Sequence, residues 1–275
     1  MNGLLLRLAG PLQSWGERSA FTPTRETAPF PTRSGLLGMF AAAEGRPRTT
    51  ALADNPYADI VLTVRADRPG TLLTDFHTAG GGLPDPLTAA TSGGKHKGAA
   101  VITRRDYLTD AVFVIAVQAP DTTLNRITQA LTTPHWAPYL GRRSCIPDEP
   151  LLLRPHCTDP VTQLLHHVPL SPDPATRAPT DHEHGTVPVR FYWETPPPHD
   201  RGQETIQLSS YDQPVSFAPH ARAHARRTLY RTTEHLPARL LTSQTDTGNR
   251  PSHQDNPPLQ ERLIRYALNT QETVA

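Results

Sequence analysis

Lysine and net charge are both scarce in this chain of 275 residues. Only Lys95 and Lys97 are lysines, so the other 25 of the 27 basic residues are arginine. Because 26 acidic residues balance them, the formal net charge is +1, and no global basic field indicates a nucleic-acid partner. Any such site must be local. The abundance of arginine and proline is typical of a GC-rich coding bias, so arginine content alone predicts nothing.

Cysteine and long apolar runs are equally rare. Cys145 and Cys157 are too few for a disulfide framework and lack the spacing of a zinc site. No stretch approaches the roughly 20 apolar residues of a membrane helix. The apolar run near the start alternates and meets Gly10-Pro11 at once, unlike a signal peptide. We therefore expect a soluble cytoplasmic protein, without a cofactor, that is long enough to bury a core.

The order of the expected elements predicts an α+β fold. Alternating leucines predict a strand at 4–8, and helical spacing of apolar residues predicts a helix from Asp121 or Thr122. The complete order is strand, helix, strand, strand, strand, helix, at 4–8, 32–45, 58–67, 71–78, 110–120 and from 121. It resembles a βαββαβ ferredoxin-like unit with a long excursion between two of its strands.

The rest of the chain is rich in proline and histidine and predicts a smaller, less regular β-rich region. Strands are expected at 187–194, 204–211 and 226–233, separated by loops. A short amphipathic helix follows at 256–269, with Asn256 as its cap.

The start of the first helix carries a cation where the helix dipole is already positive. Thr32 or Ser34 can cap this helix and Gly45 can end it, yet Arg33 stands at its first turn. Free backbone N–H groups, the small Gly35, Arg33 and the Ser34 hydroxyl together suit a phosphate. The alternative is a capped helix with Arg33 in solvent, and these residues alone leave both open.

Two further places concentrate cations in loops. The glycine-rich excursion at 79–107 carries both lysines in GGKHKG and returns through Arg104 and Arg105. Long structureless segments inside a compact domain are uncommon and are usually functional or disordered. In YLGRRSC, Gly141 suggests a turn, and Arg142 and Arg143 would point to opposite sides of an extended segment. A solvated loop is the alternative for the excursion. The arginine pair of YLGRRSC is weak evidence when taken alone.

A basic stripe at 213–233 is the fourth such place. His220, Arg222, His224 and Arg226 alternate with alanines, so an extended chain would place them on one face. A solvated edge strand protected by charge would have the same pattern. The length of the stripe favours contact with phosphate.

Other chemistry has little support. His182, Glu183 and His184 have the residue types of a metal site, but their spacing in a proline-rich loop is weak evidence. We predict no metal. No Ser-His-Asp order, nucleophile elbow or Walker-type glycine loop is present.

Five segments, taken in order, resemble a known family. They are LLLRLAGPLQSWG, FPTRSGLLGMFAAAEG, DFHTAGGG, TRRDYLTDAVFVIAV and PYLGRRSCIPDEPL. Together they closely resemble the CasD family, the subtype I-E Cascade subunits among CRISPR-associated RAMP proteins. The resemblance covers roughly residues 3–155, and more loosely 187–233.

The resemblance implies a ferredoxin-like (RRM-related) RAMP domain at 1–150 with a long thumb hairpin at about 78–105. A smaller β-rich region with Pro/His-rich loops would follow at 151–234, and a tail with a short helix at 235–275. It also implies a non-catalytic subunit that binds the 5′ handle of the CRISPR guide RNA and caps the backbone filament. The partners would be the backbone and large subunits, with target DNA met only through the complex. No membrane contact is implied.

The basic sites and the resemblance together predict a set of RNA-binding residues. These are Trp15, Arg25, Arg33, Ser34, Gly35, Lys95, Lys97, Arg104, Arg105, Tyr107, Arg142, Arg143, Arg222 and Arg226.

Two alternative functions stay open. Relatives in subtype I-C cut the repeat RNA without metal, and His77, Lys95, His96 and Tyr107 could supply acid and base groups here. The other alternative is a scaffold that binds only protein neighbours. Salt-dependent RNA binding would separate an RNA-binding subunit from that scaffold.

Overall fold

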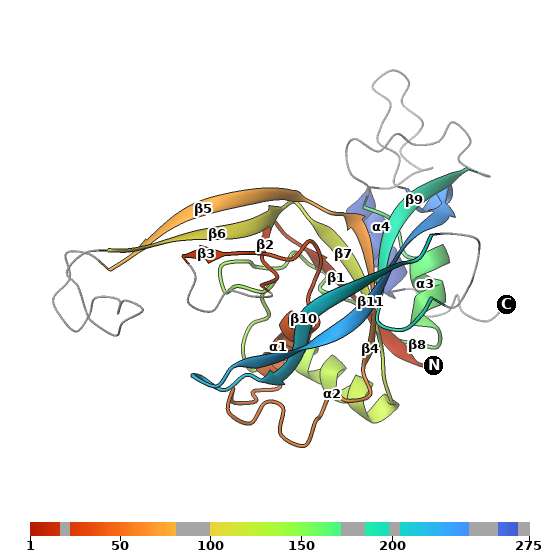
Figure 1. Ribbon diagram of the computed structural model, residues 1–275. Helices are drawn as coiled ribbons and strands as arrows, with labels where there is room; N and C mark the ends of the chain where they lie inside the picture. Colours follow the sequence, from red (N-terminus) through yellow and green to blue (C-terminus); the bar gives the residue numbers. More distant parts are fainter. Residues whose placement is uncertain (17–22, 81–99, 172–184, 198–203, 242–257, 269–275) are drawn as a thin grey trace.

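The computed structural model describes residues 1–16, 23–80, 100–171, 185–197, 204–241 and 258–268 (Figure 1). Lys95, His96 and Lys97 therefore lie outside the described residues, as does the cluster at 182–184. The described chain is a mixed α+β structure with two sheets, in which all strand pairs but β3–β6 are antiparallel.

The larger sheet has seven strands in the order β10-β11-β9-β4-β7-β1-β8, all antiparallel to their neighbours. The strands are β1 (Gly3–Ala9), β4 (Val61–Arg68), β7 (Val112–Gln118), β8 (Leu152–Cys157), β9 (Thr186–Trp193), β10 (Ile206–Ser216) and β11 (Ala223–Pro237). The strands expected from the sequence are confirmed, but β8 was not expected. The three strands of the predicted C-terminal region continue this sheet instead of forming their own. The division into three regions stays a prediction.

Helices cover both faces of the larger sheet, as Figure 1 shows. The helices are α1 (Arg33–Ala43), α2 (Asp121–Thr132), α3 (Pro160–His166) and α4 (Leu259–Leu268), with a 3-10 turn, η1 (Ala238–Leu240). One core lies on the face of α1 and α2, and a second lies on the face of α3 and α4. Leu4, Leu6 and Leu8 point into the first core and Leu5 into the second, so β1 is buried on both faces.

The predicted helix ends are partly confirmed. Thr32 is the N-cap of α1 and accepts a hydrogen bond from the amide of Gly35 at 3.3 Å. Gly45 has φ +73°, the left-handed conformation that glycine adopts readily at helix ends. The cap predicted for α2 is wrong: Pro120 takes that position without a side-chain bond. Asp121 is the first helical residue, and its Oδ1 accepts from Asn2 at 2.8 Å.

The smaller sheet forms a hairpin that projects from the body (Figure 1). Its strands are β2 (Leu12–Gln13), β3 (Thr24–Arg25), β5 (Thr71–Ala79) and β6 (Val101–Thr109), with β6 paired to each of the others. The expected strand at 71–78 is confirmed as β5, whereas β6 was not expected. Eight of the nine residues of β5 are exposed, so the described part of this hairpin adds little to either core.

The cysteines and the length of the helices bear on the predictions of no disulfide framework and no membrane helix. Cys145 and Cys157 are free and buried, Cys157 in the second core. Among the described residues, no helix has the length and apolarity needed to cross a bilayer.

Candidate nucleic-acid interface

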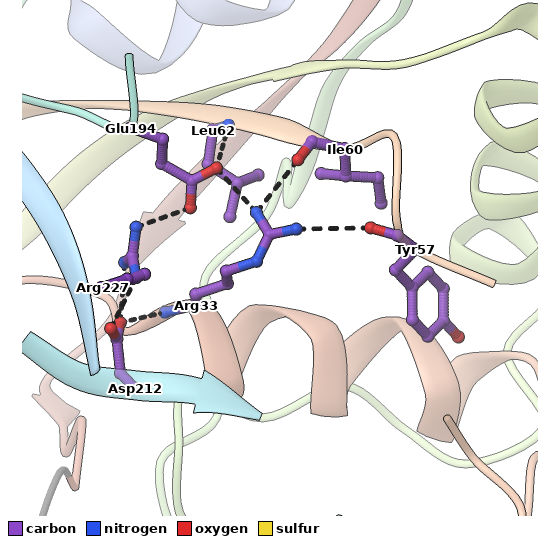
Figure 2. A network of polar contacts seen from close by, with 7 residues as sticks. All are labelled: Arg33, Tyr57, Ile60, Leu62, Glu194, Asp212 and Arg227. Atoms are coloured by element: carbon purple, nitrogen blue, oxygen red, sulfur yellow. Dashed lines mark hydrogen bonds and ion pairs between the residues drawn. The ribbon is translucent and has the colours of Figure 1, made fainter. Parts of the chain in front are cut away.

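Arg33 lies inside the protein, at the first turn of α1, with only 6% of its surface exposed. Its Nη1 donates to Glu194 Oε2 at 2.6 Å and to the carbonyl of Ile60 at 3.0 Å. Its Nη2 donates to the carbonyl of Tyr57 at 3.3 Å. Figure 2 shows the guanidinium enclosed by these groups. Its hydrogen-bonding capacity is therefore largely used by the protein itself.

Two carboxylates complete a buried network at this helix start. Asp212 Oδ2 accepts from the backbone amide of Arg33 at 2.6 Å, and both Asp212 oxygens accept from Arg227, at 2.6 and 2.7 Å. Glu194 joins Arg33 to Arg227 and also accepts from the amide of Leu62 (Figure 2). Burial alone would raise the pKa of Asp212, but the hydrogen bonds and charge of Arg227, with the Arg33 amide, lower it.

This network corrects the first site prediction. An anion does occupy the start of α1, where free amides and the helix dipole favour it, but that anion is Asp212 of β10. Arg33 is neither in solvent nor open to an RNA phosphate. Ser34 is only 5% exposed and is corrected in the same way.

Gly35 and Trp15 have a packing role that the prediction did not foresee. A Cβ on Gly35 would lie 2.9 Å from Trp15 Cε3, so glycine allows the indole to pack against α1. Trp15 is 1% exposed, and its Nε1 donates to Gln13 Oε1 at 3.0 Å. The predicted RNA contacts of Trp15 and Gly35 are therefore replaced by packing inside the first core.

Tyr107 and Arg142 form a second internal unit, at the base of the projecting hairpin. Tyr107 is 3% exposed, and the Arg142 guanidinium lies 4.8 Å from its ring centroid. Arg142 Nη2 also donates to the carbonyl of Arg25 at 2.9 Å. Gly141 lets this turn pass close to the backbone of Ser14, because a Cβ at position 141 would lie 1.8 Å from the carbonyl oxygen of Ser14. Tyr107 and Arg142 thus hold the turn. The direct RNA contact predicted for the buried Tyr107 is corrected, whereas Arg142 is half-buried and its RNA contact stays a prediction.

The remaining predicted arginines are exposed or half-buried. Arg104 and Arg143 are exposed, Arg105 and Arg25 are half-buried, and Arg25 pairs with Arg105 between β3 and β6. On the β10–β11 hairpin, Arg222 and Arg226 are also exposed. Arg226 donates to Ser209 Oγ and lies 5.8 Å from the ring centroid of Tyr211. The expected extended segment at Arg142 and Arg143 is wrong, because the chain turns here and the amide of Cys145 donates to the carbonyl of Arg142 at 2.8 Å.

Sequence analysis did not select Phe76, which lies opposite Arg104 in the β5–β6 register and is 60% exposed. An exposed ring beside an exposed arginine combines a surface for base stacking with a phosphate-binding cation, as in many single-stranded RNA sites. In the sequence, Phe76 looks like any apolar residue of a strand, so the pattern at 71–78 does not show that its ring is exposed.

Two candidate acid–base groups, His77 and Tyr107, lie close together in the structure. His77 Nε2 lies 3.5 Å from the Tyr107 hydroxyl and 2.6 Å from Asp75 Oδ2. Since Tyr107 is buried, a 2′-hydroxyl of RNA cannot approach its hydroxyl in this arrangement. Among the described residues, no group of three His, Cys, Asp or Glu side chains suits a metal ion.

Comparison with known proteins gives consistent matches. The family model described as CRISPR-associated protein (Cas_Cas5) matches residues 3–230. The CRISPR system Cascade subunit CasD of Escherichia coli (strain K12) is 37% identical over 179 residues, 62% of this chain and 79% of that protein.

Solved structures are also similar. A chain of a CRISPR RNA-guided surveillance complex is 40% identical, with a TM-score of 0.77, over 96% of this chain and 99% of that one. A second structure, of a Cas protein, is 27% identical, with a TM-score of 0.53, over 87% of this chain and 97% of that one. The first similarity extends over both sheets and is not confined to short motifs.

Proposed function

Because the chain belongs to the Cas5 family of CRISPR-associated proteins, we propose that it is a non-catalytic, RNA-binding subunit of a Cascade surveillance complex in antiviral defence. The observation that carries the proposal is the similarity, over almost the whole chain, to a chain of an RNA-guided surveillance complex. The ligand would be the CRISPR guide RNA at its 5′ handle, where the subunit caps the backbone filament in the cytoplasm. The backbone and large subunits are its protein partners.

We also infer a ferredoxin-like unit within the larger sheet. The strands β8-β1-β7-β4 are adjacent and antiparallel, and α1 and α2 follow β1 and β7 in the chain. This is the order that a βαββαβ unit produces. The β5–β6 hairpin is inserted between β4 and β7, so it takes the place of the expected thumb.

The accessible residues of this hairpin support contact with RNA. Phe76 and Arg104 face the same side. Arg105, the next residue of β6, pairs with Arg25 of β3, and Arg143 is exposed and follows Arg142, which donates to the Arg25 carbonyl. Arginine suits phosphate because its planar donors match two phosphate oxygens. We propose Phe76, Arg25, Arg104, Arg105 and Arg143, with Lys95 and Lys97 of the excursion and Arg222 and Arg226 of β10–β11, as the guide-RNA contacts.

We expect Arg104→Ala and Phe76→Ala to weaken RNA binding in different ways. Loss of a phosphate contact should reduce the slope of log affinity against log salt by about 0.7 for single-stranded RNA. Loss of a stacked base should weaken affinity by roughly 5-fold or more, from about 1–3 kcal/mol per base, without changing that slope. The measurement is titration of labelled handle RNA with the full chain at several salt concentrations.

Arg265→Ala is the matched control, since Arg265 is an exposed arginine of α4 on the other face of the sheet. The RNA affinity of Arg265→Ala and the salt dependence of that affinity should equal those of the wild type. RNA affinity of the wild type that does not depend on salt would contradict the proposal and favour the protein-binding scaffold.

The full chain is expected not to cleave repeat RNA, with or without divalent metal. Tyr107 is buried, so it cannot exchange a proton with a ribose hydroxyl, and the pair His77–Tyr107 cannot supply both the base and the acid that cleavage needs. The measurement is incubation of labelled repeat RNA in EDTA, with His77→Ala in parallel. A discrete cut at the handle boundary that disappears in His77→Ala would establish the endoribonuclease instead.

A further inference from the structure

The β5–β6 hairpin projects from the body and is joined to it at its base (Figure 1). The two strands that pair with β6 at this base, β2 and β3, have only two residues each. Ser14 Oγ adds one hydrogen bond, to the carbonyl of Asp106 at 2.9 Å. Because so few backbone hydrogen bonds oppose a rotation of the hairpin, its angle to the body also depends on side-chain contacts at the base.

Arg142 comes from a turn that is fixed in the body. Leu140 and Cys145, on either side of this turn, are both buried in the first core. The amide of Ser14 donates to the carbonyl of Leu140 at 3.0 Å, and the amide of Leu140 donates to the carbonyl of Cys145 at 2.8 Å. The Arg142 side chain therefore starts from a backbone that is held on both sides.

From this turn, the Arg142 side chain contacts two strands of the projecting sheet. Its guanidinium lies 4.8 Å from the ring centroid of Tyr107 on β6, and its Nη2 donates to the carbonyl of Arg25 on β3 at 2.9 Å. A planar guanidinium can lie against a ring and donate at its edge at the same time, whereas a lysine ammonium is a point charge. The Nη1 atom is buried, so a phosphate cannot reach it in this arrangement.

These contacts lie closer to the base of the hairpin than the residues proposed to bind RNA. Phe76 and Arg104 form a register pair three residues further out than Leu73 and Tyr107, which is about 10 Å at roughly 3.3 Å per residue. A rotation of about 10° at the base would move Phe76 and Arg104 by roughly 2 Å, which is enough to break a hydrogen bond to a phosphate.

We propose that Arg142 is a positioning residue of the RNA site. It holds the hairpin at the angle at which Phe76 and Arg104 meet the guide RNA, and it acts through Tyr107 and the Arg25 carbonyl instead of through a phosphate. This inference rests on the proposed function, which supplies the RNA.

The first test is the affinity of the full chain for labelled handle RNA. Arg142→Lys keeps the charge but loses the planar group that contacts both strands. If the hairpin then takes the binding orientation for about a tenth of the time, the apparent affinity falls about tenfold. We expect this loss in Arg142→Lys and in Arg142→Ala, with an unchanged slope of log affinity against log salt, because the bound hairpin makes the same phosphate contacts.

Two other arginines are the controls for this measurement. Arg143, the exposed neighbour of Arg142, is proposed to bind phosphate, so Arg143→Ala should lower the salt slope by about 0.7. Arg265→Ala should change neither the affinity nor the salt slope.

The second test measures the angle of the hairpin directly. Spin labels are attached through Thr78→Cys on β5 and Asn125→Cys on α2, both exposed positions, while the native Cys145 and Cys157 are buried. We expect the distribution of distances between the labels to broaden or shift when Arg142→Lys is added. A role in stability alone would lower the midpoint of thermal unfolding but would leave this distribution unchanged in the folded protein.

The outcomes separate this inference from the proposed function. A distance distribution in Arg142→Lys equal to that of the wild type would overturn the inference alone. So would wild-type RNA affinity in Arg142→Lys together with a lower salt slope in Arg142→Ala, since Arg142 would then bind phosphate. Failure of the wild type to bind handle RNA would overturn the proposed function and the RNA part of the inference, while the label distances would still decide whether Arg142 sets the angle of the hairpin.

Discussion

Asp212→Ala is expected to destabilise the protein by roughly 3–5 kcal/mol, the cost of breaking a buried ion pair by removing one partner. The Asp212 side chain is fully buried and accepts from the Arg33 amide and twice from Arg227. Without it, the start of α1 loses its anion and Arg227 loses two short hydrogen bonds. For a chain of this size the midpoint of thermal unfolding should fall by roughly 10 °C.

Asp75→Ala is the control for this prediction, because Asp75 also contacts a basic side chain, His77 at 2.6 Å, but is itself 51% exposed. Its loss should shift the midpoint by only a degree or two. Since the folded state lowers the pKa of Asp212, its contribution is complete above pH ~4 and is lost as pH falls through the lower folded value. Asp212→Asn should therefore lose less stability than the wild type on acidification below pH 4. A midpoint of Asp212→Ala within 2 °C of the wild type would show that the network is dispensable.

The same network shows what sequence could and could not provide. The pattern at 30–45 correctly predicts the helix and its end at Gly45, and Thr32 is one of the two caps that it offers, because these features depend on neighbours within a turn. It also correctly suggests that an anion belongs near Arg33. The identity of that anion depends on Glu194 and Asp212, which lie 161 and 179 positions away from Arg33. No local pattern contains the strand pairing that brings them there.

The two hairpins, β5–β6 and β10–β11, also contain features that the sequence predicts and features that it does not. Residue types typical of strands predict β5, β9 and the cores of β10 and β11. The glycine-rich composition before Ala99 concealed β6, whose residues are mostly polar and whose pairing with β5 defines the projection. Likewise, exposure separates Arg104 and Arg143 from the buried Arg33, and exposure follows from tertiary packing. The residue type alone does not distinguish an exposed arginine from a buried one.

Arg65→Met is expected to destabilise the protein as much as Asp212→Ala does. Arg65 lies on β4 and faces α3, on the side of the sheet opposite α1. Arg65 is completely buried, and it binds Asp67 through two hydrogen bonds of 2.6 and 3.0 Å. Its remaining donors reach the carbonyls of Leu164, Val168 and Pro169, which follow one another at and beyond the end of α3. Methionine fills much of the volume but leaves those carbonyls unpaired and removes the hydrogen-bonded cation of the buried Asp67 carboxylate, which keeps only the charge of the buried Arg7 nearby. Thermal unfolding should show a fall in midpoint of roughly 10 °C or more.

The double variant Arg65→Met/Asp67→Asn separates charge from packing in this loss. Asparagine removes the uncompensated charge and can still accept from the Ser171 amide, which now donates to Asp67 at 3.0 Å. If the buried charge dominates, the double variant should recover roughly 1–3 kcal/mol relative to Arg65→Met, although Asp67→Asn alone destabilises the wild type. If the unpaired carbonyls dominate, the double variant should be no more stable than Arg65→Met. Equal midpoints for Arg65→Met and the wild type would mean that α3 is held to the sheet by its apolar contacts alone, since Arg65 is the side chain that links β4 to the end of that helix.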